Sequence, residues 1–400
     1  FMKKNNCRVC CGNEINLVLE FDNIPNSMDL REDDNSNHTT INLPVMQCQS
    51  CGFVFINETF SENELYTEHY AETSTYPPNH IDSLVKRTIS MMGNKQLELC
   101  VDIGSNNGYF LEKFSSYFDT LLGVEPGSIY STNYLSNNMS IVDEYFNSSL
   151  AIDIVHKHGL SDLITCRHVI EHINELDDFF DGINYLLNDH GLLVLEVPDF
   201  NIIMNRGDFM SIWEQHINYF ELQTLKILLG RNGLLIESHE CVSNGGGSLV
   251  LFVRKMRGDN LYKNNYSNDF NDLHASFVSK MEHNINKIQS LMYDFSSQGK
   301  IVVMYGAGNK GNMLVNLSGI GQYLYKVLDD NSNKQGQFLP GSSIPIALSS
   351  ELLDSDVCII PPMTESTIVD KIIKKNMNYI SQGGIFVRFF GVDDFIEIVS

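Results

Sequence analysis

Residues 97–111 read LELCVDIGSNNGYFL, and this stretch decides how the middle of the chain folds. An apolar run ends at Asp102 and Ile103, a glycine-rich turn follows, and the residues after Gly108 begin a helix. A strand, a glycine turn and a helix can cradle a nucleotide, because backbone N–H groups at the helix N-terminus point toward the ligand. The spacing from Gly104 to Gly108 is G-x-x-x-G, not the G-x-G-x-x-G of dinucleotide binders.

The next apolar run, TLLGVEPG at 120–127, ends in Glu125. This acid follows the turn by about 20 residues, the distance expected of a group that accepts hydrogen bonds from ribose hydroxyls. Two further apolar runs are LITCRHVIEHI at 163–173 and GLLVLEVPDF at 191–200. Strands that alternate with helices predict a parallel, doubly wound sheet. In this order, the motifs predict the core of an S-adenosylmethionine (SAM) methyltransferase.

The residues expected to contact SAM lie in the glycine turn and after the next two strands. They are Asp102, Gly104, Asn106, Asn107, Gly108, Glu125, Pro126 and His168. The two glycines allow the backbone to approach a ligand closely. His168 has a second interpretation, because a histidine at the end of a strand is often only structural.

Four cysteines near the N-terminus form two C-x-x-C pairs, Cys7 with Cys10 and Cys48 with Cys51. This spacing lets two thiolates of one tight turn reach a single tetrahedral ion. Between the pairs lies REDDNSNH at 31–38, which cannot supply much core, and a small domain with little core needs a metal. The pairs therefore predict a structural zinc site with four cysteine ligands. Idle or redox-active pairs are the alternative.

A second strand, glycine turn and helix, KIVVMYGAGNKGNMLVNL, covers residues 300–317 and predicts another Rossmann-like domain. A long amphipathic helix is expected before it, up to about residue 297. The turn, with a lysine as a point charge, is a favourable place for phosphate. The expected substrate-binding residues are Gly306, Gly308, Lys310, Asn331 and Lys334. The turn also reads G-x-G-x-x-G, so a dinucleotide dehydrogenase with Asp329 as the ribose acid is an alternative.

The chain has 400 residues and a formal net charge of −23. Its length predicts two or three domains. An acidic surface repels phosphate backbones, so nucleic acid is not an expected partner. No apolar run reaches the roughly 18 residues of a membrane span, and no signal-peptide pattern occurs. We therefore expect a cytoplasmic protein whose cysteines are thiols or metal ligands.

The whole series of motifs resembles the sugar C-methyltransferases. It comprises the cysteine pairs and then VDIGSNNGYFL, GVEP, HVIEHI, EVP, IWEQHINYF, GGGSL, YGAGNKG and DDNSNKQGQFLPG. Members of this family methylate nucleotide-linked 4-keto-deoxysugars at C3. The resemblance, over about residues 7–395, implies an α/β protein with four parts. These are a small zinc-binding domain (1–75), a central Rossmann-like SAM methyltransferase domain (76–258), a helical connector (259–297) and a C-terminal Rossmann-like nucleotide-sugar domain (298–400).

The resemblance also implies proton abstraction from carbon. A 4-ketone makes the C3 proton acidic, a histidine base removes it, and the enolate then takes the methyl group from SAM at C3. A histidine that is neutral near physiological pH suits this role. The family pattern places the base at His216, within IWEQHINYF at 212–220. The implied catalytic residues are His216, His172, Gln215, Glu214, Tyr219 and Tyr70.

Several positions depart from the family pattern I-Y-H-E-H-x-x-Y-F. Gln215 replaces the glutamate before the base, and Trp213 and Glu214 replace a tyrosine and a histidine. Nearer the N-terminus, Glu72 stands where the family has a tyrosine. A glutamine can still hydrogen-bond but cannot balance an imidazolium. Because the SAM features largely remain, these changes indicate retained methyl transfer with an altered substrate or regiochemistry.

Other functions remain open from the sequence. A SAM-dependent O-methyltransferase acting on a nucleotide-linked metabolite needs no acidic C–H, and His216 would then deprotonate oxygen. A catalytically inactive homologue would bind nucleotides without turnover. His216 itself has a structural alternative, a buried histidine that caps the following helix. Glu214 is either a relocated acid or a surface charge.

Overall fold

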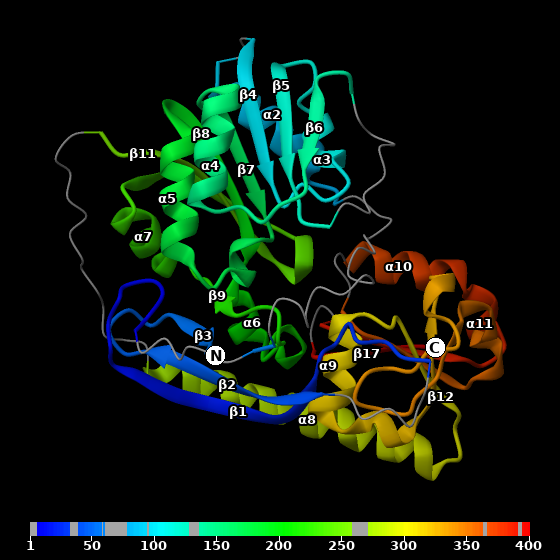
Figure 1. The fold of residues 1–400 in the computed structure, drawn as a ribbon. Helices are drawn as coiled ribbons and strands as arrows, with labels where there is room; N and C mark the ends of the chain where they lie inside the picture. The colour runs from blue at the N-terminus through cyan, green and yellow to red at the C-terminus, as the bar shows by residue number, and fades with distance from the viewer. Residues whose placement is uncertain are drawn as a thin grey trace.

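A computed structural model of the chain contains three β-sheets in its described part (Figure 1). It describes residues 6–32, 39–57, 59–60, 78–93, 96–127, 136–257, 271–362, 366–390 and 394–400. Two of the sheets are doubly wound and mostly parallel, which confirms the predicted α/β class. Among these residues, no helix is both long and apolar enough to span a membrane.

The largest sheet, in the middle of the chain, has seven strands in the order β10-β11-β8-β7-β4-β5-β6. The five strands from β8 to β6 run parallel, whereas β11 is antiparallel to both of its neighbours. The strands are β4 (Leu97–Ile103), β5 (Phe118–Val124), β6 (Met139–Val142), β7 (Ser161–Arg167), β8 (Leu187–Pro198), β10 (Leu234–Val242) and β11 (Ser248–Lys255).

Helices cover both faces of this sheet (Figure 1). Leu150, Phe179 and Leu228 of α4, α5 and α7 are buried on one face, and Leu84 and Phe110 of α2 and α3 are buried on the other. The helices are α2 (Ile81–Met91), α3 (Tyr109–Glu112), α4 (Ser148–His158), α5 (Leu176–Leu186), α6 (Phe200–Arg206) and α7 (Leu222–Arg231), with short 3-10 turns η2 (Ile170–His172), η3 (Phe209–Ser211) and η4 (Asn244–Gly246).

The chain leaves β4 in one direction, through β5 and β6, and returns to the other side of β4 with β7 and β8. In an open α/β sheet, this reversal leaves a crevice beyond the carboxyl ends of the two central strands, where ligands bind. Gly104 follows β4 and His168 follows β7, and both have positive φ angles, 73° and 54°. The sheet therefore brings the predicted glycine turn and the predicted strand-end histidine to one place.

The C-terminal sheet repeats this plan with six strands in the order β14-β13-β12-β15-β16-β17. Its reversal lies between β12 and β15, and β17 alone among its described strands runs antiparallel to its neighbour. The strands are β12 (Val302–Tyr305), β13 (Leu324–Asp329), β14 (Ile346–Leu348), β15 (Val357–Ile360), β16 (Ile385–Phe389) and β17 (Ile396–Val399). The helices are α9 (Asn309–Ser318), α10 (Ser366–Lys375) and α11 (Met377–Ser381), with 3-10 turns η5 (Ile320–Tyr323), η6 (Ser332–Lys334) and η7 (Ser349–Asp354).

The N-terminal sheet is antiparallel and is completed from the middle of the chain. Its order is β1-β2-β3-β9, from β1 (Ile15–Pro25), β2 (Thr40–Cys48), β3 (Val54–Ile56) and β9 (Asn218–Tyr219). Val54 pairs with Tyr219, and Phe55 with Asn218. The stretch 212–220 thus ends as a strand of the sheet that begins in the predicted zinc-binding domain.

One long helix, α8 (Asn271–Ser297), ties the sheets together, and it is the helix that the sequence predicts before the C-terminal domain. Apolar residues at helical spacing, among them Phe277, Met281 and Ile288, are buried in a core shared with β1, β2, the segment 200–219 and the C-terminal sheet. On the same helix, the Asn284 amide donates to the carbonyls of Arg206 and Gly207, at 2.9 and 3.1 Å. These hydrogen bonds satisfy carbonyl groups at the C-terminal end of α6 that have no partner within the helix.

The first prediction concerns the close packing at the crevice. A Cβ added at Gly104 would lie 2.3 Å from Val169 Cγ2, whereas Gly233 has a similar φ (+71°) and nothing within 4 Å. Gly233→Ala should cost about 1 kcal/mol from backbone strain, and Gly104→Ala about 2 kcal/mol more from the added clash. Urea unfolding of both variants measures the difference. Equal losses would show that Val169 moves aside freely.

Candidate functional site

The crevice beyond β4 is shaped by a network around the glycine turn. Asn106, with φ +49°, donates its N–H to Glu125 Oε2 at 2.9 Å. Its side chain accepts from Asn107 N at 2.7 Å, and Asn107 Oδ1 accepts from Tyr109 N at 3.1 Å, at the start of α3. The turn is therefore held rigidly by its own asparagines. Gly108 is left-handed and has Met139 behind it, so its backbone alone faces the crevice.

Of the two acids of this crevice, Asp102 is buried and Glu125 is half-buried. Asp102, at the end of β4, accepts a 2.6 Å hydrogen bond from Thr165 Oγ1 of β7, and burial raises the pKa of Asp102 to about 6. Burial also raises the pKa of Glu125 to about 7, against the hydrogen bond from Asn106. Pro126 follows at the half-buried rim. Both acids favour a ligand that donates hydrogen bonds to them.

His168 lies between two buried carboxylates. Its Nδ1 is 3.2 Å from Glu171 Oε1 and its Nε2 is 3.2 Å from Glu196 Oε1. Glu196 Oε2 also accepts from Arg167 Nε at 2.7 Å and lies 3.1 Å from His80 Nε2. Burial acts to lower the pKa of His168, but the two carboxylates raise it to about 9. The imidazole is therefore charged at neutral pH, and the two carboxylates, rather than solvent, stabilise its charge.

The two predicted active-site histidines stand together. Their ring centroids are 4.8 Å apart and the rings are nearly perpendicular, and Trp213 lies 4.6 Å from His216. His172 Nδ1 lies 2.9 Å from the carbonyl oxygen of Gln215. Burial lowers the pKa of His172. Burial and the neighbouring His172 hold the pKa of His216 well below its ordinary value. His216 is thus a neutral imidazole near pH 7.

Several buried polar atoms of the candidate site have no hydrogen-bond partner in the described part of the chain. Within the described residues, both side-chain polar atoms of Gln215 are buried and unpaired. So is one oxygen each of Glu171, Asp208, Glu214 and Asn244. Native proteins seldom leave such groups unsatisfied, so their concentration here indicates that a polar ligand completes them.

Glu214 is fully buried and lies where three parts of the chain meet, so it is not a surface charge. Its Oε1 accepts from Ser27 N at 2.9 Å and from Ser27 Oγ at 2.7 Å. Ser27 Oγ also contacts Asn309 Oδ1, at the start of α9, at 3.3 Å. Burial raises the pKa of Glu214 to about 7, so a fraction of the side chain is protonated at neutral pH.

Two further predicted catalytic residues differ in their placement. Tyr219 lies in β9, where its hydroxyl accepts from Trp213 N at 3.3 Å and its ring packs on Phe200. It therefore fixes the shape of the 213–219 loop. Tyr70, like Glu72, lies outside the described residues.

The C-terminal glycine turn faces the same junction. Lys310 Nζ is 3.5 Å from Asp208 Oδ2, and Lys334 Nζ is 3.2 Å from the carbonyl of Ala307. Asn331 accepts from Asn333 N and caps η6. Of the predicted substrate residues, Gly306, Gly308 and Lys334 thus surround one turn, and Lys310 reaches the middle domain from it.

Asp329, the ribose acid of the dehydrogenase alternative, is already engaged. Its Oδ2 accepts from Ala307 N at 2.8 Å and its Oδ1 accepts from Asn331 N at 2.9 Å. Because both oxygens hold backbone N–H groups, the geometry does not favour a dinucleotide ribose here.

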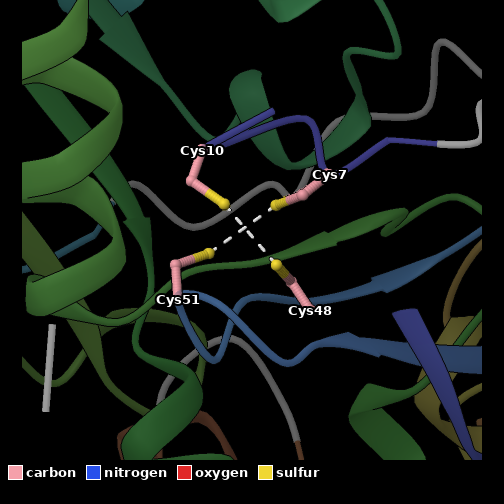
Figure 2. Close-up of side chains that lie close together, drawn as sticks. All are labelled: Cys7, Cys10, Cys48 and Cys51. Carbon is pink, nitrogen blue, oxygen red and sulfur yellow. Dashed lines mark hydrogen bonds between the residues drawn. The ribbon is translucent and has the colours of Figure 1, made fainter. Parts of the chain in front are cut away.

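The four predicted metal ligands converge. Figure 2 shows the sulfurs of Cys7, Cys10, Cys48 and Cys51 turned toward a common centre. The Sγ atoms of Cys7 and Cys51 are 3.6 Å apart, and those of Cys10 and Cys48 are 3.5 Å apart. Four thiolates at about 2.3 Å from a tetrahedral zinc ion would lie about 3.8 Å from one another, so the set fits the ion.

Arg8, inside the first cysteine turn, reaches the loop that carries His216. Its buried guanidinium donates to the carbonyls of Ile56 and Ile217, at 3.1 and 3.2 Å. It also donates to the side-chain oxygens of Asn218 and Asn174, at 3.3 and 3.1 Å. The cysteine cluster and the candidate site are therefore joined by one side chain.

The sequence did not single out Arg8, Ser27, Glu171 or Glu196. Glu171 and Glu196 lie within the motifs VIEH and EVP, so a signal was present for both. For Arg8 and Ser27 the partners are more than 180 residues away at their farthest, and no local pattern indicates them.

Comparison with known proteins agrees with this geometry. A family model described as "Methyltransferase domain" matches residues 79–239, and one described as "C-methyltransferase C-terminal domain" matches residues 244–390. C-methyltransferase NovU of Streptomyces niveus is 26% identical over 397 residues, which are 95% of this chain and 94% of that protein.

Solved structures with similarity to part of the chain include YcgJ of Bacillus subtilis, at 13% identity and a TM-score of 0.33. It covers 44% of this chain and 98% of its own. N-methyltransferase NodS of Bradyrhizobium japonicum is similar at 14% identity and a TM-score of 0.32, over 45% of this chain and 98% of its own.

The central sheet and the matching family model define the class as SAM-dependent methyltransferase. The similarity does not stop at that sheet, because the C-terminal model and NovU extend it over nearly the whole length. Over nearly its whole length, the chain is similar to C-methyltransferases.

The second prediction concerns the pH dependence of the His168 network. Because the pKa of His168 is raised to about 9 in the folded protein, its stabilising contribution is complete below about pH 6.5 and is lost as the pH rises through 9. Because the His168 side chain is 30% exposed, we expect the free energy of unfolding to fall by only about 1 to 2 kcal/mol. The measurement is the difference in unfolding free energy between wild type and His168→Asn at pH 6.5 and 9.5. A difference that does not change with pH would contradict the charged network.

Proposed function

We propose that this protein transfers a methyl group from SAM to a carbon next to the ketone of a nucleotide-linked keto-deoxysugar, C3 being the expected position. The supporting observation is the pair of half-buried histidines, His172 and His216, at the junction of the two Rossmann-like parts. A neutral imidazole can act as a general base at physiological pH.

We assign SAM to the crevice of the central sheet. Glu125 would accept hydrogen bonds from the ribose hydroxyls through the oxygen that Asn106 does not use. The backbone of the turn from Gly104 to Gly108 would approach the nucleoside closely, and Asp102, Asn107, Pro126 and His168 border the same crevice. When bound, SAM supplies a methyl group on a positively charged sulfur.

In the proposed reaction, His216 removes the proton on the carbon next to the ketone. The resulting negative charge is shared with the ketone oxygen, so a hydrogen-bond donor near that oxygen lowers the barrier. Gln215 has an unpaired amide, and the partly protonated Glu214 has a free oxygen. We infer that these two groups contact the oxygens of the sugar.

The nucleotide part of the substrate is assigned to the C-terminal glycine turn. Backbone N–H groups at the start of α9 favour phosphate oxygens. Lys310 lies opposite Asp208 of the middle domain, so it stands close to both halves of the site. Gly306, Gly308, Asn331 and Lys334 complete the proposed set.

The cysteine cluster is proposed to hold a structural zinc ion. Four thiolates leave no open coordination position, so the ion would not take part in the reaction. Its role would be to shape the turn of Cys7 to Cys10, from which Arg8 holds the His216 loop.

The third prediction tests the base. His216→Ala should lower the exchange of the C3 proton with deuterated water, and the methyl transfer, by about 100-fold or more. Mass spectrometry of products from labelled SAM and a panel of nucleotide sugars, each as 4-ketone and 4-alcohol, measures both. Exposed His156 supplies the control variant His156→Ala. Methylation of the alcohol without exchange would move the enzyme to O-methylation.

The fourth prediction tests the metal. The folded protein should hold about one zinc ion per chain, and Cys51→Ser should lose it together with much of its stability. Exposed Cys241 gives the matched control, Cys241→Ser, which should retain the ion. Elemental analysis of both variants decides. A zinc-free, fully stable wild type would contradict the proposal.

A further inference from the structure

Glu171 is a buried carboxylate beside both histidines of the site. The sequence motifs and the similar proteins assign it no role. It is 1% exposed. One oxygen contacts His168, and Oε2 is buried without a hydrogen-bond partner among the described residues. A carboxylate oxygen of Glu171 and one ring nitrogen each of His172 and His216 lie within 4.8 Å of one another. Leaving a buried carboxylate oxygen unused is costly, so this oxygen needs a partner.

Backbone contacts hold these three residues in register. Ile217 N donates to the Glu171 carbonyl at 2.9 Å, which fastens the residue after His216 to the residue before His172. In return, His172 Nδ1 lies 2.9 Å from the Gln215 carbonyl and, as an N–H, donates to it. This contact leaves His172 Nε2 as the acceptor nitrogen of the neutral ring. The carboxylate and the two rings therefore keep a fixed relation without any ligand.

The proposed reaction places a positive charge where the surroundings oppose it. Burial, the neighbouring His172 ring, and the positive charges of His168 and Lys310 all act against a protonated His216. Gln215, next to the base, has no negative charge to offer.

The other acids near this loop are directed elsewhere. Glu214 turns one oxygen to Ser27, and Asp208 pairs with Lys310. Glu196 is held by Arg167 and His168. Glu171 is the carboxylate of the described site that remains close to both rings.

We propose that Glu171 is a positioning residue that orients the His172–His216 pair and balances the imidazolium formed on His216. This inference rests on the proposed role of His216 as the base. His168, between Glu171 and Glu196, contacts the Glu171 carboxylate and fixes its direction. The carboxylate exchanges no atom with the substrate and acts only through the two rings.

The fifth prediction is the effect of Glu171→Gln on the pH profile of C3 proton exchange. Removing a negative charge within about 5 Å lowers the pKa of an imidazole by about one unit. The acidic limb of the profile should therefore move about one unit to lower pH. The plateau should fall about tenfold because the base is weaker, with KM for the nucleotide sugar unchanged within about threefold. General structural damage would lower the plateau without moving the limb.

Matched variants make this test decisive. Glu175→Gln makes the same substitution at an exposed position four residues later and should leave the profile unchanged. Glu171→Asp keeps the charge and should keep the limb within about 0.3 unit of its wild-type position. If Glu171→Gln does not fold, Glu171→Ala, which also removes the charge, should move the limb in the same direction, and an unmoved limb would contradict the proposal.

A readout without substrate separates this proposal from the proposed function. Titration of the histidine ring protons by NMR, with His216→Ala and His172→Ala to assign the signals, should show lower midpoints for one or both rings in Glu171→Gln. If the midpoints shift but the wild-type protein shows no C3 exchange, the interaction of Glu171 with the histidines stands and the proposed function is wrong. If C3 exchange depends on His216 but is unchanged in Glu171→Gln, the proposed function stands and the proposed role of Glu171 is wrong.

The same three side chains offer donors that a divalent cation accepts. Titration with Mn²⁺, followed by electron paramagnetic resonance, distinguishes this occupant. Micromolar binding by wild type that disappears in Glu171→Gln would make the group a metal site and overturn the counter-charge proposal. Absence of such binding, together with a moved acidic limb, is the expected result.

Discussion

The Arg8 guanidinium is the contact on which the geometry of the site depends. It lies in the first cysteine turn and donates to Ile56, Asn174, Ile217 and Asn218, which belong to three separate parts of the chain. The hydrogen bond from this buried guanidinium fixes the position of the Ile217 carbonyl, directly after His216. The cysteine turn thus fixes a loop more than 200 residues away, which would give the proposed metal site a structural role in an enzyme whose proposed chemistry needs no metal.

From this anchor the loop crosses the junction of both Rossmann-like parts. Glu214 contacts Ser27, Ser27 contacts Asn309, and Lys310 faces Asp208, so the N-terminal part and the C-terminal glycine turn meet around one short segment. The core shared by β1, β2, α8 and the C-terminal sheet makes this junction a packed interior rather than a hinge between separate domains.

The sequence predicted those features of the site that depend on short, fixed spacings along the chain. The glycine turn at Gly104, the acid at Glu125 and the paired cysteines have fixed spacings, and the structure brings each set together. The addition of β9 to the N-terminal sheet was not predictable, because a two-residue strand has no period. Arg8 and Ser27 were missed because their partners are distant in sequence. Glu171 was missed although it stands between Ile170 and His172 in a recognised motif, since only the fold shows that its carboxylate faces the rings.

The charges around the site explain how a glutamine can stand next to the base. Arg167 and His168 are balanced by Glu196 and Glu171, so this network is neutral before reaction. In the proposed reaction, proton abstraction creates an imidazolium and an enolate together, and the two charges offset each other. Methyl transfer then removes the enolate charge and leaves the imidazolium alone in a buried site. A nearby carboxylate matters most at this stage, because an unpaired buried cation would make the proton hard to keep until it is released. Placing that carboxylate at Glu171, rather than at position 215, frees the Gln215 amide to contact the substrate.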